Sequence, residues 1–250
     1  MTYCVGIRLD AGLVFLSDSR TNAGLDQIST FRKMIVYEKP GDRFICLLSA
    51  GNLSISQSVR EILQVEKIPS GEPDGEPLTI WNATSMFDVA RVLGAAVRRV
   101  HEQDGAALRA AGVDFNVSMI LGGQIGEEAM RMFLVYSAGN FIEATRETCY
   151  FQIGESKYGK PILDRALQYA TPLEQALRCA LISFDSTIRS NLSVGMPLDV
   201  LVYRADSLLI PEGYRVSEGD AYFESIRAFW GAGLRQLLGE LPGLPDDYWR

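Results

Sequence analysis

Three residues in the first 33 positions could together hydrolyse an amide bond. The chain begins "MTYCVGIRLD", so removal of Met1 would leave Thr2 as the amino terminus. A terminal threonine carries a hydroxyl nucleophile and a base, its own α-amine, on one residue. The ordinary pKa of an α-amine is roughly 7.7 to 8.0, and a nearby Lys33 ammonium would lower that pKa by charge repulsion. With Asp18 to orient Lys33, this trio would need no histidine base.

Gly51 could supply a fourth group, the donor for an oxyanion. It lies in "LLSAGNLSIS", between a predicted strand and a predicted helix. A turn of small residues there can direct the Gly51 backbone N–H at a developing negative charge. Such a glycine is also common as a plain turn, and an Asp18–Lys33 pair taken alone favours a structural salt bridge. The signal is therefore the combination of Thr2, Asp18, Lys33 and Gly51.

The predicted elements indicate how these residues meet. The segments "YCVGIRLD" and "LVFLSDSR" are apolar strands joined by a short glycine turn, which is typical of a β-hairpin. Antiparallel pairing brings Asp18, at the end of the second strand, near the chain start. Lys33 opens the next predicted strand, which can lie beside the same sheet. We therefore expect the three residues at one end of a sheet.

The rest of the sequence alternates between groups of strands and pairs of helices. Helical apolar spacing follows Gly51 in "NLSISQSVREILQVEK", and a longer helix is predicted over 84–111. Strands return in "NVSMILGGQI", "MRMFLVYSAG", "FIEATRE" and "CYFQIG". Two helices, in "SKYGKPILDRALQYA" and "TPLEQALRCALISFDSTIRSN", precede a last strand, "PLDVLVYRAD", and a last helix, "DAYFESIRAFWGAGLRQLLGEL".

This element order predicts the fold class. Strands do not alternate with single helices, so a doubly wound parallel sheet is disfavoured. Two antiparallel sheets covered by helix pairs would use every element. We predict an α+β fold, a four-layer αββα sandwich in which residues 1–250 form one domain with a tail at about 241–250. Tyr248 and Trp249 in this tail are candidate interface anchors, with a frayed polar tail as the alternative.

Composition excludes several classes of partner. The net charge is −7, whereas nucleic acids and anionic membranes attract clustered cationic side chains. We see no secretory leader and no apolar run long enough to span a bilayer, and expect a cytoplasmic protein. The single histidine, His101, lies in a charged helical stretch and is expected to be solvated. The cysteines are widely spaced, which predicts reduced thiols and no structural zinc: Cys4, Cys46, Cys149 and Cys179.

The amino-terminal residues resemble a known family. Thr2, "SDSRTNAG", "FRK" and "SAGN" followed by a helix are similar to proteasome β-type subunits and their bacterial relative HslV. The stretch "MTYCVGIRLDAGLVFLSDSRTNAGLDQISTFRKM" resembles Anbu more closely, the bacterial proteasome homologue also called the ancestral β-subunit. The resemblance covers essentially the whole chain. It implies the αββα fold of N-terminal-nucleophile hydrolases, a threonine-type peptidase, and no metal or organic cofactor.

The resemblance also implies a role for each matching residue. Thr2 matches the nucleophile, Asp18 the acidic orienter, Lys33 the lysine that perturbs the amine, and Gly51 the oxyanion glycine. Ser193 matches the serine of an Arg-Asp-x-x-Ser pattern before the last strand.

A second set of residues matches positions around the substrate. Thr21 and Asn22 fall where the family pairs its backbone with an extended peptide. Arg20, grouped with them in substrate binding, is also expected to support the site by packing and hydrogen bonding.

Two places depart from the family pattern. Proteasome subunits carry a Gly-Ser-Gly turn near the terminal amine, whereas this chain reads "IGESKYG", so either Glu155 or Ser156 fills that place. An acidic Glu155 beside the amine would raise the amine pKa rather than lower it. Ser190 stands where the Arg-Asp-x-x-Ser pattern has its aspartate.

Three interpretations of the function follow. The first is a self-compartmentalising threonine peptidase or amidase, a large homo-oligomer in a ring or spiral that acts on peptides or proteins, with an ATPase partner left open. The second keeps the fold and acts on small molecules as an amidase or acyl transferase. The third is an assembly subunit with a silent site, which the departures favour and the retained Thr2, Asp18 and Lys33 disfavour.

Overall fold

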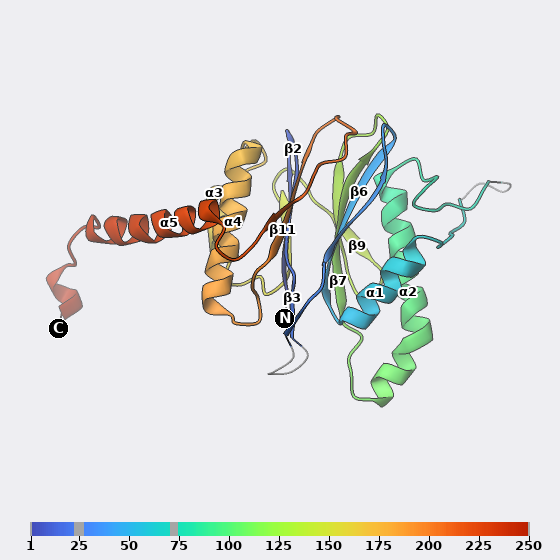
Figure 1. The fold of residues 1–250 in the computed structure, drawn as a ribbon, viewed down its shortest axis with the longest axis horizontal. Coiled ribbons are helices and arrows are strands. Elements are labelled where there is room, and N and C mark those ends of the chain that lie inside the picture. The colour runs from blue at the N-terminus through green and yellow to red at the C-terminus, as the bar shows by residue number, and fades with distance from the viewer. Residues whose placement is uncertain (1, 23–27, 71–74, 250) are drawn as a thin grey trace.

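Two five-stranded antiparallel sheets face each other at the centre of the fold (Figure 1). The computed structural model describes residues 2–22, 28–70 and 75–249. The first sheet has the order β10-β1-β2-β11-β12, with bounds β1 (Tyr3–Leu9), β2 (Gly12–Asp18), β10 (Tyr150–Gly154), β11 (Leu198–Arg204) and β12 (Tyr214–Val216). The second has the order β5-β6-β7-β8-β9, with bounds β5 (Met34–Lys39), β6 (Arg43–Gly51), β7 (Val117–Ile125), β8 (Arg131–Val135) and β9 (Phe141–Glu143). A separate ribbon pairs β3 (Arg20–Asn22) with β4 (Ile28–Thr30).

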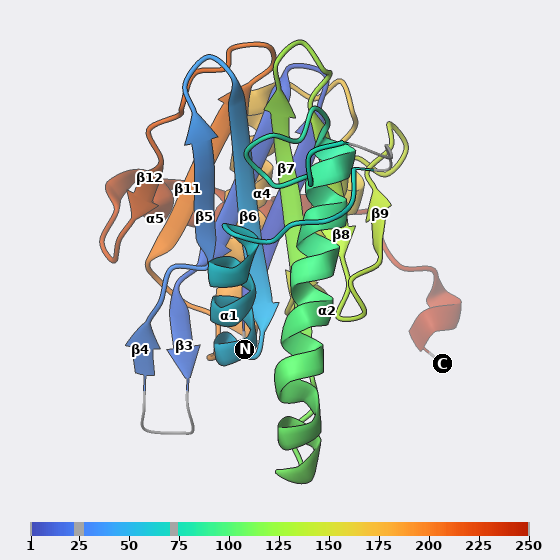
Figure 2. The ribbon, with the colours of Figure 1, turned by 90° about the vertical axis from the view of Figure 1, so that its right-hand side faces the viewer.

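Helices cover the outer face of each sheet. The second sheet is covered by α1 (Leu53–Leu63) and α2 (Met86–Ala110), which Figure 2 shows in front of it. The first sheet is covered by α3 (Lys160–Ala166) and α4 (Leu173–Ser190). The last helix, α5 (Ala221–Gly239), runs away from α4 toward a short 3₁₀ turn, η1 (Asp246–Trp249). The four-layer αββα sandwich predicted from the sequence is confirmed.

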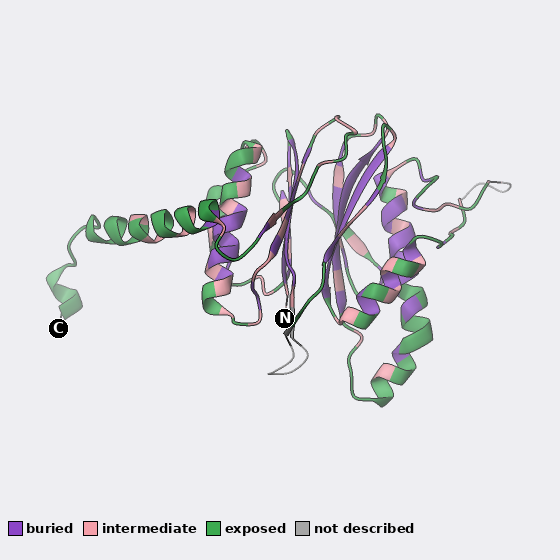
Figure 3. Ribbon diagram, viewed as in Figure 1, coloured by how far each residue is buried: buried purple, intermediate pink, exposed green. Residues whose placement is uncertain are grey.

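Three apolar cores hold the layers together. One lies between the sheets and includes Phe44 and Tyr203, whose rings stack with centroids 4.4 Å apart. The other two lie between each sheet and its helices, where Figure 3 shows the buried faces turned inward. All seven residues of β2 are buried, because this strand has a sheet neighbour on each side and a packed layer on each face. Asp18, at the end of β2, is therefore carried into the interior.

Strand register brings the chain start to that same place. Cys4 pairs with Ser17 across β1 and β2, and Tyr3 pairs with Gly154 across β1 and β10. Leu198 of β11 pairs with Asp18. The first residues of β1 thus lie between the ends of β2 and β10, at one edge of the two-sheet sandwich.

Most predicted elements are present, with shifted ends. Asn52 caps α1 by accepting from the backbone N–H of Ser54 at 3.0 Å. The helix predicted to begin at Thr171 begins two residues later, at Leu173, with Pro172 as its N-cap. The sequence missed β12 and the β3–β4 ribbon, whose strands are three residues long and too short for a periodic pattern.

Two compositional expectations have direct structural counterparts. Three of the four cysteines are buried and Cys179 is half-buried, all as free thiols. His101 is an exposed residue of α2. None of the helices in the described ranges is long and apolar enough to cross a bilayer.

Candidate active site

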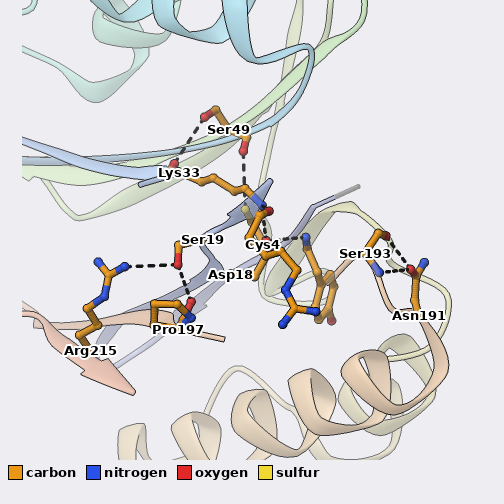
Figure 4. Close-up of polar contacts among 11 residues, drawn as sticks. Cys4, Asp18, Ser19, Lys33, Ser49, Asn191, Ser193, Pro197 and Arg215 are labelled. Carbon is orange, nitrogen blue, oxygen red and sulfur yellow. Dashed lines mark hydrogen bonds and ion pairs between the residues drawn. The ribbon is translucent and has the colours of Figure 1, made fainter. Parts of the chain in front are cut away.

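A buried ion pair between Asp18 and Lys33 lies at the centre of the candidate site. Lys33 Nζ donates to Asp18 Oδ1 at 2.7 Å and to the backbone carbonyl of Arg20 at 2.6 Å. The Asp18 side chain is fully buried and that of Lys33 is 5% exposed. Figure 4 shows the Lys33 side chain pointing toward Asp18, with Cys4 beside the pair. The sequence predicted this contact, and the structure places it at the carboxyl end of β2.

The peptide group between Thr2 and Tyr3 holds the chain start beside this ion pair, because both of its polar atoms are hydrogen-bonded. The backbone N–H of Tyr3 donates to Asp18 Oδ1 at 3.0 Å. The Thr2 carbonyl accepts from the backbone N–H of Glu155 at 2.7 Å. Gly154 has a φ of +81°, and a Cβ there would lie 1.9 Å from the Thr2 carbonyl oxygen. Only glycine allows this approach, so residue 2 is held at a defined point beside the ion pair.

Burial and the neighbouring charge of Lys33 have opposite effects on the pKa of Asp18. Burial raises the pKa of Asp18 above its ordinary value, and the charge and hydrogen bond of Lys33 act against that rise. Burial also raises the pKa of the Cys4 thiol, with the Asp18 carboxylate adding to the effect. Cys4 therefore stays a neutral thiol, and it is not a competing nucleophile.

Arg20 anchors the segment that follows α4. Its guanidinium donates to the carbonyl of Leu192 at 3.1 Å. It also packs on Gly195, where an added Cβ would lie 2.3 Å from Arg20 Cζ. Arg20 thus holds this segment by packing and hydrogen bonding. The backbones of Thr21 and Asn22 pair with Ser29 and Ile28 in the β3–β4 ribbon, and a substrate-binding role for all three remains a prediction.

Ser193 lies on this anchored segment and bonds to a neighbour. Its hydroxyl donates to Asn191 Oδ1 at 2.6 Å, and its backbone N–H donates to the same oxygen at 2.9 Å (Figure 4). Among the contacts of the described residues, none joins Ser193 to Thr2 or Asp18. Ser190, in place of the family's aspartate, is an exposed residue at the end of α4. Asn191 is a polar partner that sequence reasoning missed, although it stands two positions before Ser193.

Gly51 closes β6 in a conformation that other residues avoid. Its φ is +108°, and a Cβ there would lie 2.3 Å from the carbonyl oxygen of Asn116. The strand is tied to the ion pair two residues earlier, because the Ser49 backbone N–H donates to the Lys33 carbonyl at 3.0 Å. Gly51 is exposed, and its role as the oxyanion donor remains a prediction.

Of the two candidates in "IGESKYG", Glu155 is the one that contacts Thr2, through its backbone N–H. Ser156 closes the turn by donating its backbone N–H to the Gly154 carbonyl at 3.0 Å. Both residues are half-buried. The turn therefore holds residue 2 by main-chain contacts.

A buried polar network supports this turn, and sequence reasoning missed it. The Tyr3 and Ser183 hydroxyls are hydrogen-bonded at 2.6 Å. The Gln152 amide donates to the Tyr3 hydroxyl and, at 3.2 Å, to the Ser156 carbonyl. Burial raises the pKa of Tyr3, so its phenol stays neutral. The one signal in the sequence was an amide at Gln152 in an otherwise apolar strand.

No group of three or more His, Cys, Asp or Glu residues in the described ranges could hold a metal ion.

A buried Lys–Asp pair beside a fixed residue 2, in an αββα sandwich, defines the class of proteasome β-type N-terminal-nucleophile folds. No family model and no curated protein matches the chain. Solved structures do. Anbu (ancestral β-subunit) from Yersinia bercovieri is 51% identical, with a TM-score of 0.87 and coverage of 97% of this chain and 98% of that chain. The structure described as the helical assembly of the Anbu complex from Pseudomonas aeruginosa is 53% identical, with a TM-score of 0.89 and coverage of 98% and 99%.

A third solved structure extends the likeness. The Gly-1 mutant of Anbu from Hyphomicrobium sp. strain MC1 is 42% identical, with a TM-score of 0.88 over 98% of this chain and 100% of that chain. The chain belongs to the Anbu family.

Proposed function

We propose that the chain is a threonine-type peptidase or amidase whose nucleophile is the Thr2 hydroxyl after removal of Met1. One observation carries this proposal: Asp18 Oδ1 accepts from Lys33 Nζ at 2.7 Å and from the Tyr3 N–H at 3.0 Å. The only residue ahead of Tyr3 in the mature chain would then be Thr2, placed beside a buried ammonium. A subunit that only assembles has no physical need for this arrangement.

The proposed reaction uses groups of this chain alone. The Thr2 α-amine takes the proton of the Thr2 hydroxyl, and the oxygen attacks the substrate carbonyl carbon. The Gly51 backbone N–H stabilises the resulting oxyanion. The C–N bond breaks, the leaving amine takes the proton from the Thr2 ammonium, and an acyl-ester remains on Thr2. Water, activated by the same amine, hydrolyses this ester and restores the free hydroxyl.

An extended peptide is the substrate that the surroundings fit best. The strand β3 runs from Arg20 to Asn22, and the carbonyl of its first residue accepts from Lys33 Nζ of the ion pair. It pairs with β4 on one side, and no other strand of the described chain pairs with it. Its second edge is thus available for backbone pairing with a peptide. If the chain forms a large cytoplasmic homo-oligomer, the assembly would restrict access to the site to unfolded chains. An ATPase that supplies unfolded chains is a further part of the proposal.

Peptide hydrolysis by matched threonine variants tests this function. Thr2→Ala removes the nucleophile and should abolish cleavage of short fluorogenic peptides, whereas Thr148→Ala, at an exposed threonine far along the chain, should retain it. Equal cleavage by wild type and Thr2→Ala would contradict the proposal. No cleavage of any peptide by the assembled wild-type protein would favour the silent assembly subunit, an alternative supported by the exposed Ser190 and by the Ser193–Asn191 contact.

A further inference from the structure

A pocket opens on the side of the sandwich where each sheet ends in an edge strand. Strand β5 ends the second sheet and β12 ends the first, and Figure 2 shows both at the same side of the molecule. The pocket between them encloses about 450 Å³, which is in the range of small-molecule sites. Apolar side chains from both sides contribute to its lining: Met34, Val36, Leu201 and Ile210.

The first sheet presents to this pocket a carboxylate oxygen that lacks a hydrogen-bond partner. Asp199 of β11 lines the pocket, and its Oδ1 accepts from Arg215 Nη1 at 3.2 Å. Its Oδ2 is buried and has no partner among the described residues. The hydroxyl of Ser17, which pairs with Asp199 across β2 and β11, is also buried without a partner there. Because buried polar atoms are nearly always hydrogen-bonded in proteins, this wall of the pocket fits a ligand that brings a donor.

The opposite wall carries two guanidinium groups that have no carboxylate partner. Arg32, just before β5, is exposed, and Arg60 of α1 is half-buried. Arg60 Nη1 donates to the Arg32 carbonyl at 3.1 Å, which keeps the two residues together. Within the described ranges neither forms an ion pair, and Glu38, the other acidic residue of the lining, lies near the far end of β5. Guanidinium groups in this state match a carboxylate.

We propose that this pocket binds a short peptide with both termini free, whose ammonium donates to Asp199 and whose carboxylate accepts from Arg32 and Arg60. An anion alone would leave Asp199 Oδ2 without a donor. An amine alone would leave both guanidinium groups unpaired. A ligand that carries the two charges at its two ends satisfies both walls, and its side chains lie on the apolar part of the lining.

The pocket adjoins the candidate active site and is separate from it. None of the catalytic candidates lines it. Asp199 pairs with Ser17, the residue before Asp18, and Arg215 Nη2 donates to the hydroxyl of Ser19, the residue after it, at 3.4 Å (Figure 4). Short peptides with free termini are also what the proposed hydrolysis releases, and this link alone rests on the proposed function.

Blocked forms of one dipeptide test the ligand class in the full-length protein. Titration calorimetry in a Thr2→Ala background measures binding without cleavage of the ligand. Alanyl-leucine with free termini should bind with a Kd of about 1 mM or lower. Its N-acetyl and C-amide forms should each bind at least about tenfold more weakly, because each loses one charge-assisted contact. Equal affinity of the free and blocked forms, or no binding of the free form, would overturn the proposal.

Substitutions in the pocket test where the dipeptide binds. Asp199→Asn keeps the shape of the side chain and removes its charge, so it should weaken binding of the free dipeptide at least about tenfold and leave the N-acetyl form unchanged. Arg32→Gln with Arg60→Gln should do the same for the free dipeptide and leave the C-amide form unchanged. The control pair, Arg109→Gln with Arg165→Gln, changes exposed arginines of α2 and α3 outside the pocket and should bind as the background does.

Unchanged affinity in both pocket variants would mean that the dipeptide binds elsewhere, such as at the cleft beside residue 2, and would overturn the proposal. Thermal melts check that each variant is folded. The comparison of free and blocked dipeptides needs no change in the pocket, so a variant that fails to fold leaves that test intact. Because binding is measured without the Thr2 hydroxyl, failure of the proposed activity would leave this result standing.

Discussion

Lys33 Nζ lies 2.7 Å from Asp18 Oδ1, the oxygen that also accepts the backbone N–H of Tyr3. The carboxylate therefore couples a buried ammonium to the first hydrogen-bonded residue of the chain. Both side chains are buried, so water screens this coupling little. The buried ammonium beside residue 2 is the feature on which the proposed base depends.

Lys33→Ala should slow acylation of Thr2 by about tenfold or more at neutral pH, because the amine pKa would return toward its ordinary value. The effect should shrink as the pH rises, since the amine is then neutral in both proteins. The variant also leaves Asp18 buried without its ion-pair partner, which should cost about 3–5 kcal/mol of unfolding free energy. The rate at which a peptide epoxyketone labels Thr2, measured as a function of pH, reports the first effect. Urea unfolding reports the second.

Lys39→Ala is the matched control, because Lys39 is an exposed residue of the strand that follows Lys33. It should change neither the labelling rate nor the unfolding free energy by more than about 0.5 kcal/mol. A Lys33→Ala protein that labels at the wild-type rate at every pH would show that Lys33 does not tune the amine.

Acid should silence the site before it unfolds the protein. Below the amine pKa the logarithm of the labelling rate should fall with a slope of about one per pH unit, steepening to about two when Asp18 also gains a proton. Because burial raises the Asp18 pKa, this second loss should begin at a higher pH than for an ordinary aspartate. A raised native pKa means that the folded state binds this proton more readily than the unfolded state, so protonation of Asp18 does not itself favour unfolding.

Labelling rate and near-ultraviolet circular dichroism, measured across the same acid range, check this order of events. A slope that stays at one until the dichroism signal collapses would show that Asp18 does not have to be ionised for acylation.

Gly154→Ala should displace the chain start. Its Cβ would lie 1.9 Å from the Thr2 carbonyl oxygen, and its φ of +81° already disfavours alanine. Gly41→Ala is the control for backbone strain alone, because Gly41 has a φ of +73° and nothing within 4 Å of its added Cβ. Both should lose about 1 kcal/mol of stability from that strain, and only Gly154→Ala should lose most of its labelling rate. Equal labelling rates for the two variants would show that activity does not depend on the close approach of Gly154 to Thr2.

Gln152 should act as a positioning residue for the same turn. Gln152→Leu removes the donor to the Ser156 carbonyl at 3.2 Å and to the Tyr3 hydroxyl. Labelling should slow by several-fold to about tenfold with an unchanged pH profile, because the turn loosens while the amine keeps its charged neighbours. Gln57→Leu, on the exposed face of α1, should have no effect. A shifted pH profile in Gln152→Leu would assign it a role in the base instead.

Sequence predicted the Asp18–Lys33 contact because Asp18 ends one predicted strand and Lys33 opens the next, although Lys33 reaches Asp18 from the opposite sheet, where it precedes β5. It predicted the layers because groups of strands and pairs of helices leave few ways to bury their apolar faces. The close approaches at Gly51 and Gly154 are visible only with coordinates, because the neighbours that exclude a side chain, Asn116 and Thr2, are far away in the sequence.

The buried polar network around Tyr3 could not be predicted from the sequence, for a similar reason. Tyr3, Gln152 and Ser183 come from β1, β10 and α4, and no spacing rule connects them. The length of α5 could be predicted from the sequence, but the exposure of most of its side chains could not. An amphipathic helix read from sequence is assumed to cover its own core, whereas here only Phe223 is buried.

The most direct test is the site of covalent modification by a peptide epoxyketone, a probe that requires both a hydroxyl and a free amine on one residue. Intact mass should first show that Met1 is absent, and tandem mass spectrometry should then place the adduct on Thr2. Thr2→Ala should carry no adduct while it keeps the wild-type assembly. A retained Met1, or an adduct found only on a cysteine such as the half-buried Cys179, would contradict the threonine mechanism.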